Sequence, residues 1–160
     1  MAKAQTSIIM ILLVIMVFIG MIMFLLSLAK TVSREEYMNL YVHNLLVSIL
    51  RSDTGDYSDY ECKTVADALM CAFRENKICP SGKSCREIAE DFINESINKF
   101  KEIKGYRYLF IARPSAGWIA SYKLEVGDSD LLTEKVKKIT ANEKIQRGDY
   151  ILDVTLIISK

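Results

Sequence analysis

The stretch IIMILLVIMVFIGMIMFLL, residues 8–26, decides how the rest of the chain is organised. Its 19 residues carry no charge, and as an α-helix they would be about 28 Å long, close to the ~30 Å hydrocarbon core of a bilayer. The apolar region of a cleaved secretory signal is usually shorter, about 7–15 residues. The small residues that follow leave cleavage after Ala29 open, but the length favours a helix that is retained. A plain single-pass anchor is the simplest interpretation of this run.

The remainder of the chain has the opposite composition. Charged residues fall almost entirely after Lys30, and the whole chain of 160 residues carries 21 Lys and Arg against 20 Asp and Glu. No basic stripe is present, so a nucleic-acid partner is not indicated. A part of about 130 residues is long enough to bury a modest core. The sequence therefore predicts an α+β head domain over residues 30–160.

A short polar segment, KAQTS at residues 3–7, stands directly ahead of the apolar run. It resembles the class III signal peptide of archaeal type IV pilin-like proteins, in which a prepilin peptidase cuts after a small residue that follows a basic one. The resemblance implies a cut between Ala4 and Gln5, with a leader at residues 1–4 and a transmembrane or filament-core helix at residues 5–29. Many family members carry Glu at the fifth mature position. Ile9 stands there in this chain, which is compatible with a minor or divergent subunit.

The resemblance also implies a function. The chain would be a structural subunit of an archaeal type IV pilus-like surface filament, with identical or related pilin subunits as partners and membrane lipid around the helix before assembly. It would reside in the cell membrane as a single-pass protein with its C-terminal domain outside, and in an extracellular filament once assembled. The alternative is a single-pass membrane-anchored extracytoplasmic binding or sensory module, because an apolar run of this length requires only a bilayer.

Motifs for catalysis are missing from the sequence. Nucleotide-binding glycine motifs, the G-x-S-x-G motif and the H-E-x-x-H motif do not occur, and His43 is the only histidine. A general base requires a positioned partner, which a lone histidine on a polar helix face does not indicate. We therefore expect no enzyme and no cofactor, and an anchored enzyme is the least favoured interpretation.

Helical periodicity continues after the apolar run. An S-x-x-E capping box at residues 33–36 predicts that the helix restarts or kinks near Ser33. Apolar residues then recur on one helix face from Met38 to Leu50. A second helix is predicted over residues 62–73. A third is predicted to start at the capping box of residues 84–87 and to end at Gly105.

The C-terminal part is predicted to be rich in β-structure. Alternating apolar residues indicate strands at residues 106–112, 117–126, 143–146 and 150–158, with a turn at residues 114–117, a short helix at residues 130–138 and a hairpin turn at residues 147–149. The RGD tripeptide of that hairpin is interpreted as a turn rather than a receptor-binding motif. The predicted fold class is α+β: a long N-terminal hydrophobic and amphipathic helix, a disulfide-stapled helical pair and a C-terminal antiparallel sheet, as in type IV pilin-like architecture.

Four cysteines, Cys62, Cys71, Cys79 and Cys85, lie within 24 residues. Without a C-x-x-C knuckle or a nearby histidine, a structural zinc site is less favoured than two disulfides. Disulfides in turn indicate an oxidising exterior or a thermophilic source. Cys62 and Cys71, on one predicted helix, would be about 13 Å apart along its axis, too far to pair. The preferred pairing is Cys62–Cys85 with Cys71–Cys79, because Cys62 and Cys85 lie on apolar faces that should meet. The alternative, Cys62–Cys79 with Cys71–Cys85, suits a simple antiparallel hairpin.

Two further features concern the predicted surface. Asn94 begins an Asn-Glu-Ser sequon and is a candidate glycosylation site if its helix exposes it. The loop at residues 52–61 carries four acidic residues but lacks the EF-hand spacing, so a solvated loop is favoured over a calcium site.

Overall fold

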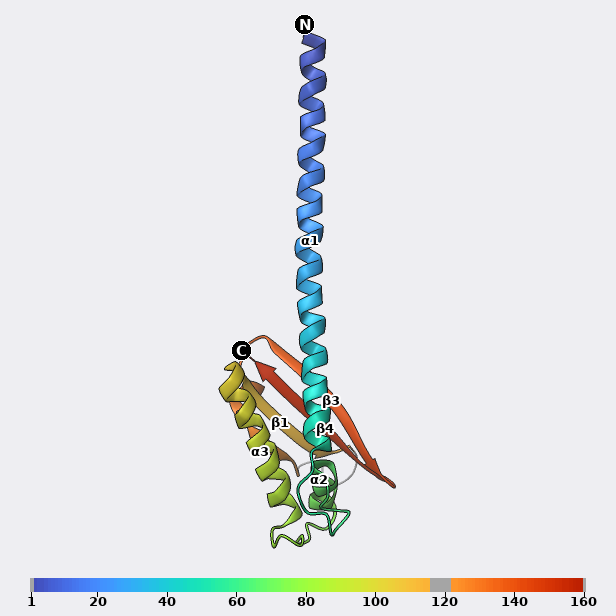
Figure 1. Ribbon diagram of the computed structural model, residues 1–160, viewed down its shortest axis with the longest axis vertical. Helices are drawn as coiled ribbons and strands as arrows, with labels where there is room; N and C mark the ends of the chain where they lie inside the picture. Colours follow the sequence, from blue (N-terminus) through green and yellow to red (C-terminus); the bar gives the residue numbers. More distant parts are fainter. Residues whose placement is uncertain (1, 116–121, 160) are drawn as a thin grey trace. The chain divides into compact units, whose positions relative to one another are not determined.

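The computed structural model describes residues 2–115 and 122–159, and for residues 2–9, 30–34 and 100–104 it describes the backbone alone. The chain divides into two compact units, Met1–Met38 and Asn39–Lys160. Helix α1 (Ala2–Arg51) contributes residues to both of them (Figure 1). Each unit is described separately below.

The first unit is the apolar part of α1. Its side chains from Met10 to Leu28 are about half to two-thirds exposed. Among the described helices, only the segment Met10–Ala29 is long and apolar enough to cross a membrane, a property shared by signal sequences near an N-terminus. α1 is continuous through Ser33, so the predicted restart of the helix there is wrong. An S-x-x-E sequence caps a helix only where the preceding backbone leaves the helical conformation, and here it does not.

The second unit begins with the last turns of α1. These turns bury one face of the helix, as the apolar periodicity predicts, through Val42, Leu45, Leu46, Ile49 and Leu50. Helix α2 (Val65–Arg74) starts three residues later than predicted, because the Thr64 side chain accepts a hydrogen bond from the Asp67 N–H and forms its N-cap.

Helix α3 (Cys85–Lys104) has the predicted capping box at its start. The Glu87 carboxylate accepts a hydrogen bond from Ser84 N at 2.8 Å, and Glu87 N donates to Ser84 Oγ at 3.2 Å. These bonds lower the pKa of Glu87, chiefly through the backbone N–H of Ser84. After α3, Gly105 has a φ of +63°, which confirms the predicted helix end.

In the described residues, the strands form one antiparallel sheet in the order β2-β1-β4-β3: β1 (Arg107–Pro114), β2 (Leu124–Gly127), β3 (Lys138–Arg147) and β4 (Tyr150–Ser159). The predicted hairpin is confirmed, since β3 and β4 pair from Lys138↔Ser159 to Arg147↔Tyr150. Gly148, with a φ of +61°, supplies the left-handed conformation that this two-residue turn requires. The predicted strand at residues 117–126 is present from Leu124 onward. Tyr122 and Lys123 are described and lie outside the strand, so the prediction is wrong there; residues 117–121 and the end of the predicted turn at residues 114–117 fall outside the described residues.

The predicted helix at residues 130–138 is wrong. Only a short 3₁₀ turn, η1 (Ser129–Leu132), forms there, and the chain is already in β3 by Lys138. This segment is held by Arg107 of β1, whose guanidinium lies 2.7 Å from Asp128 Oδ2 and 2.6 Å from Glu134 Oε2. Those hydrogen bonds, the one to Asp128 first, raise the pKa of Arg107. Contacts to β1 therefore outweigh the weak local helix preference.

The main core lies between one face of the sheet and the helices of the second unit (Figure 1). Alternate residues of each strand supply it, including Phe110, Leu152, Val154 and Leu156, all fully buried. The opposite face carries a small cluster in which Leu131 of η1 covers Leu109 and Ile157. The α+β class is confirmed, and α2, the start of α3 and the loops before and after α2 form a disulfide-linked corner of the second unit.

Candidate functional site

The four cysteines form two disulfides, Cys62–Cys79 and Cys71–Cys85, with Cα–Cα distances of 6.1 and 5.8 Å. The preferred pairing, Cys62–Cys85 with Cys71–Cys79, is therefore wrong, and the alternative is the one that forms. The physical reason is the late start of α2. Cys62 precedes the N-cap Thr64 and lies in the preceding loop rather than on the helix face. From there it pairs with the loop that follows α2, and Cys71 on α2 pairs with the first residue of α3.

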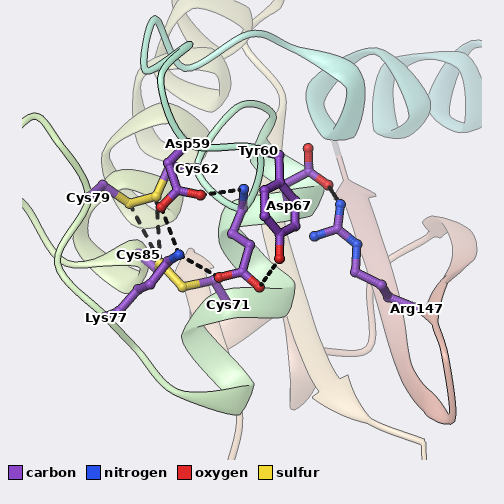
Figure 2. A network of polar contacts seen from close by, with 10 residues as sticks. Asp59, Tyr60, Cys62, Asp67, Cys71, Lys77, Cys79, Cys85 and Arg147 are labelled. Carbon is purple, nitrogen blue, oxygen red and sulfur yellow. Dashed lines mark hydrogen bonds and ion pairs between the residues drawn. A yellow bond between two sulfur atoms is a disulfide. The ribbon is translucent and has the colours of Figure 1, made fainter.

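The two disulfides lie against each other in the interior (Figure 2). All four cysteines are at most 5% exposed. Between the two bonds, Cys79 Sγ lies 3.6 Å from Cys85 Sγ, and Cys62 Sγ lies 4.0 Å from the same atom. We call this group, Cys62, Cys71, Cys79 and Cys85, the sulfur cluster. The sequence spacing predicted proximity in pairs but did not predict that the two pairs touch.

A charged triad covers this corner of the molecule. Lys77 Nζ lies 2.7 Å from Asp59 Oδ2 and 2.6 Å from Glu61 Oε2. The hydrogen bonds from Lys77 lower the pKa values of Asp59 and Glu61, and a further bond from the Glu61 N–H to Asp59 adds to the effect at Asp59. The same two bonds raise the pKa of Lys77. The acidic loop is thus partly neutralised by a lysine that sequence analysis did not single out.

The remaining acids of this loop also have internal roles. Asp56 is 9% exposed, and its carboxylate accepts a hydrogen bond from Ser81 N at 3.0 Å. Asp53 forms an isolated β-bridge with Thr64. Among the side chains that the structure describes, no group of three carboxylates or histidines is close enough to hold a metal ion, and only Cys62, Cys79 and Cys85 place three possible ligand atoms within 4.8 Å of one another.

An exposed tyrosine and an arginine extend the polar network (Figure 2). The Tyr60 ring lies 5.6 Å from the Arg147 guanidinium and 6.0 Å from Lys77 Nζ, distances typical of cation–π contacts. Arg147, at the end of β3, also donates a hydrogen bond to Asp67 of α2. The RGD turn therefore has a structural role in which its arginine joins the sheet to α2. Nothing in the local sequence indicates this contact.

The other predicted site residues lie apart from the sulfur cluster. Asn94 is exposed on α3, which meets the accessibility that glycosylation requires, and its modification stays a prediction. The processing site at Ala4 and Gln5 falls within the backbone of α1 and also stays a prediction. His43 is exposed on α1.

Comparisons of the chain with protein-family models, with curated proteins and with solved structures find no match. The class of protein is defined by its structure: an α+β chain with an N-terminal apolar helix of membrane-spanning or signal-sequence character, an antiparallel sheet and two buried disulfides. Within that class, the apolar segment and the sulfur cluster are the two features with chemical consequences beyond folding.

Proposed function

We propose that the chain is a structural subunit of a type IV pilus-like archaeal surface filament, assembled through its N-terminal helix. The observation that carries this proposal is the apolar segment Met10–Ala29, whose large apolar side chains range from 49% exposed at Leu28 to 69% at Met16. Such a surface is not stable in water and must be covered by hydrocarbon or by other protein. In a filament, the same segments of neighbouring subunits cover one another.

The KAQTS segment is what favours a filament over a permanent bilayer anchor. A cut between Ala4 and Gln5 would remove only the leader and would leave the whole apolar segment at the new N-terminus. α1 also carries five core residues of the second unit between Val42 and Leu50. One unbroken helix therefore supplies both the assembly surface and part of the head's core, which suits a subunit that holds its position through its helix.

This function defines the partners and the location. A prepilin peptidase removes residues 1–4, membrane lipid covers the helix before assembly, and identical or related pilin subunits cover it afterwards. The α+β head lies outside the cell and forms the filament surface. The chemistry requires neither a cofactor nor a nucleic acid.

The proposal is tested on protein purified from its native membrane. Intact mass and N-terminal peptide analysis should give a mature chain beginning at Gln5, and electron microscopy should show fibres that persist without detergent. Ala4→Leu should block the cut because the peptidase requires a small residue, whereas Ala2→Leu, two residues upstream, should be processed normally. A chain that still begins at Met1 or Ala2 and forms no fibres argues strongly against the proposal.

The second candidate is a single-pass anchored binding or sensory module. It is favoured by Ile9, which occupies the position where many pilin-like proteins carry Glu. In this case the bilayer alone covers Met10–Ala29, and the purified protein stays in detergent micelles without assembling. An unprocessed N-terminus together with detergent-dependent solubility supports this candidate.

A further inference from the structure

We propose that the sulfur cluster has a second, metal-binding state. When both disulfides are reduced, the thiolates of Cys62, Cys71, Cys79 and Cys85 bind one soft divalent cation, Zn²⁺, as a closed tetrathiolate site. This inference does not depend on the filament function, since it concerns the second unit alone.

Two of the distances between the sulfur atoms match such a site. With Zn–S bonds of about 2.3 Å, the sulfurs of a tetrahedral site lie about 3.8 Å apart. The two contacts measured between the disulfides are 3.6 Å for Cys79 and Cys85 and 4.0 Å for Cys62 and Cys85. The Sγ atoms of Cys62, Cys79 and Cys85 all lie within 4.8 Å of one another, and Cys71 is bonded to Cys85. Once the bonds are reduced, the two sulfurs of each former disulfide must separate to about 3.8 Å, and the Cys71 side chain must rotate toward the other three sulfurs to complete the site.

The backbone brings Cys79 and Cys85 close together, although their spacing in the sequence is not that of a common zinc motif. Zinc sites commonly use a C-x₂₋₄-C turn, and Cys79 and Cys85 are separated by five residues. The β-bridge between Ile78 and Ser84 brings these two cysteines together, and Cys79 N donates to Lys83 O at 2.8 Å inside the turn. Cys62, just before α2, and Cys71, on α2, supply the other two ligands, so the ligands come from separate chain segments, as in structural zinc sites.

Burial and charge define the kind of site. The four residues are 0–5% exposed, which leaves no open position for water or substrate and identifies a structural rather than a catalytic metal site. Cys85 is the first residue of the 20-residue helix α3, where the positive end of the helix dipole favours the thiolate form. In the reduced state, one metal ion would link the four cysteine positions that the two disulfides link in the oxidised state.

The two states are linked by a balanced reaction. Each disulfide accepts two electrons and two protons from a reductant; with a water-soluble phosphine, the phosphine takes up the oxygen of one water and becomes the phosphine oxide. Four thiols result. On binding Zn²⁺ they release four protons, and the site carries a net charge of −2. A sulfur atom in a disulfide cannot also bind the metal as a thiolate. Oxidation therefore expels the metal, and metal binding protects the thiols from oxidation.

The test uses the full chain in detergent micelles, reduced with a phosphine under argon and titrated with Co²⁺ and then Zn²⁺. The expected result is one Co²⁺ per chain with tetrahedral d–d and sulfur-to-cobalt charge-transfer absorption, displaced by one Zn²⁺. Native mass spectrometry should find one zinc per reduced chain and none per oxidised chain. Zn²⁺ should raise the unfolding temperature of the reduced chain and leave that of the oxidised chain unchanged.

Two variants make the test specific. Cys71→Ser should lose the four-sulfur spectrum, and because it also breaks a disulfide, its folding is checked by circular dichroism with and without Zn²⁺. His43→Ala, the matched control, should bind Co²⁺ as the parent does, since His43 is exposed on α1. A reduced chain that binds no Co²⁺, gives an octahedral spectrum, binds more than one ion, or binds equally well after Cys71→Ser overturns the proposal.

Discussion

Arg147 donates a hydrogen bond to the Asp67 carboxylate, which joins the end of β3 to the first turn of α2 across 80 residues of sequence. Both side chains are partly buried, at 36% and 21% exposure. Asp67 also accepts a hydrogen bond from Thr64 Oγ1 at 2.8 Å, and its N–H donates to the same hydroxyl. The sheet is therefore attached to the N-cap of α2, which lies between Cys62 and Cys71 in the sequence.

A double-mutant cycle measures this contact. Arg147→Ala, Asp67→Asn and the double variant should give a coupling free energy of unfolding of about 0.5–1 kcal/mol, as expected for a partly screened ion pair. The matched control is Lys99 with Glu95, an ion pair on α3 whose side chains are 68% and 62% exposed. If the coupling for Arg147 and Asp67 does not exceed that of the control pair, the attachment has no energetic role.

The Lys77 triad should make the stability of the head depend on acid pH. Its lowered carboxylate pKa values mean that the stabilisation is present above the ordinary values of 3.8 for Asp59 and 4.5 for Glu61. It is lost as the pH falls through the lower values of the folded state. Lys77→Gln should therefore lower the unfolding temperature at pH 7, and the difference from the parent should shrink as the pH falls below 4.5.

At alkaline pH the direction of the dependence is opposite, because the stabilisation by Lys77 is lost as the pH rises. Because the pKa of Lys77 is raised, its stabilisation is complete below the ordinary lysine value of 10.5 and is lost progressively as the pH rises from there through the higher pKa of the folded state. Lys83→Gln serves as the control, since Lys83 and Asp91 form a pair that is more than half exposed. Melting curves from pH 3 to pH 7 that run parallel for Lys77→Gln and the parent would refute this role.

Each disulfide should contribute measurably to stability. The closed loops span sequence separations of 17 and 14 residues, and a bridge over a loop of about 15 residues stabilises by about 3 kcal/mol. The paired replacements Cys62→Ser with Cys79→Ser, and Cys71→Ser with Cys85→Ser, should each lower the free energy of unfolding by roughly that amount without leaving an unpaired thiol. Peptide mapping under non-reducing conditions should recover Cys62 with Cys79. Recovery of Cys62 with Cys85 would contradict the structure.

Two glycines with positive φ should respond differently to substitution. At Gly127, with a φ of +113°, an added Cβ would lie 2.3 Å from the Tyr108 carbonyl oxygen. Gly127→Ala should therefore destabilise the head by roughly 1–3 kcal/mol in chemical denaturation. At Gly148, with a φ of +61° and open space around the Cβ position, Gly148→Asn should be nearly neutral because Asn tolerates the left-handed conformation. Equal effects at the two positions would show that the close approach at Gly127 has no cost.

A charge in the apolar segment should impair membrane retention. Ile19→Lys places an ammonium near the middle of Met10–Ala29, at a cost of about 2.5–3.5 kcal/mol for a membrane helix. Tyr37→Lys is the control, because Tyr37 is 67% exposed on α1 outside that segment. Alkaline extraction should release more of the Ile19→Lys chain than of the control. Equal retention of both would show that the segment does not span the bilayer.

Local patterns predicted most of the fold. The apolar run, the buried face from Val42 to Leu50, the capping box of Ser84 and Glu87, and the β3–β4 hairpin each depend on residues close in sequence, so their physical causes are visible there. The segment after β2 was predicted incorrectly because Arg107, more than twenty residues earlier, holds it through Asp128 and Glu134.

The candidate site was less predictable. A shift of three residues in the start of α2 moved Cys62 from a helix face into a loop and reversed the disulfide pairing. The contacts of Lys77 with Asp59 and Glu61, and of Arg147 with Asp67, join side chains that only the tertiary fold brings together. The contact between the two disulfides has the same origin, since it depends on how the loops on either side of α2 pack.

The position of β4 in the sheet has a consequence for biosynthesis. β4 pairs with both β1 and β3, yet it follows both of them in the sequence. While the chain emerges from the ribosome, β1 and β3 therefore have no common neighbour until residues 150–159 have been translated. The apolar helix is made first and is available to a membrane or a targeting factor long before the sheet closes. On the function proposed above, insertion of the helix would precede completion of the head, and cysteine oxidation in an unfinished head would be a step at which non-native pairs form.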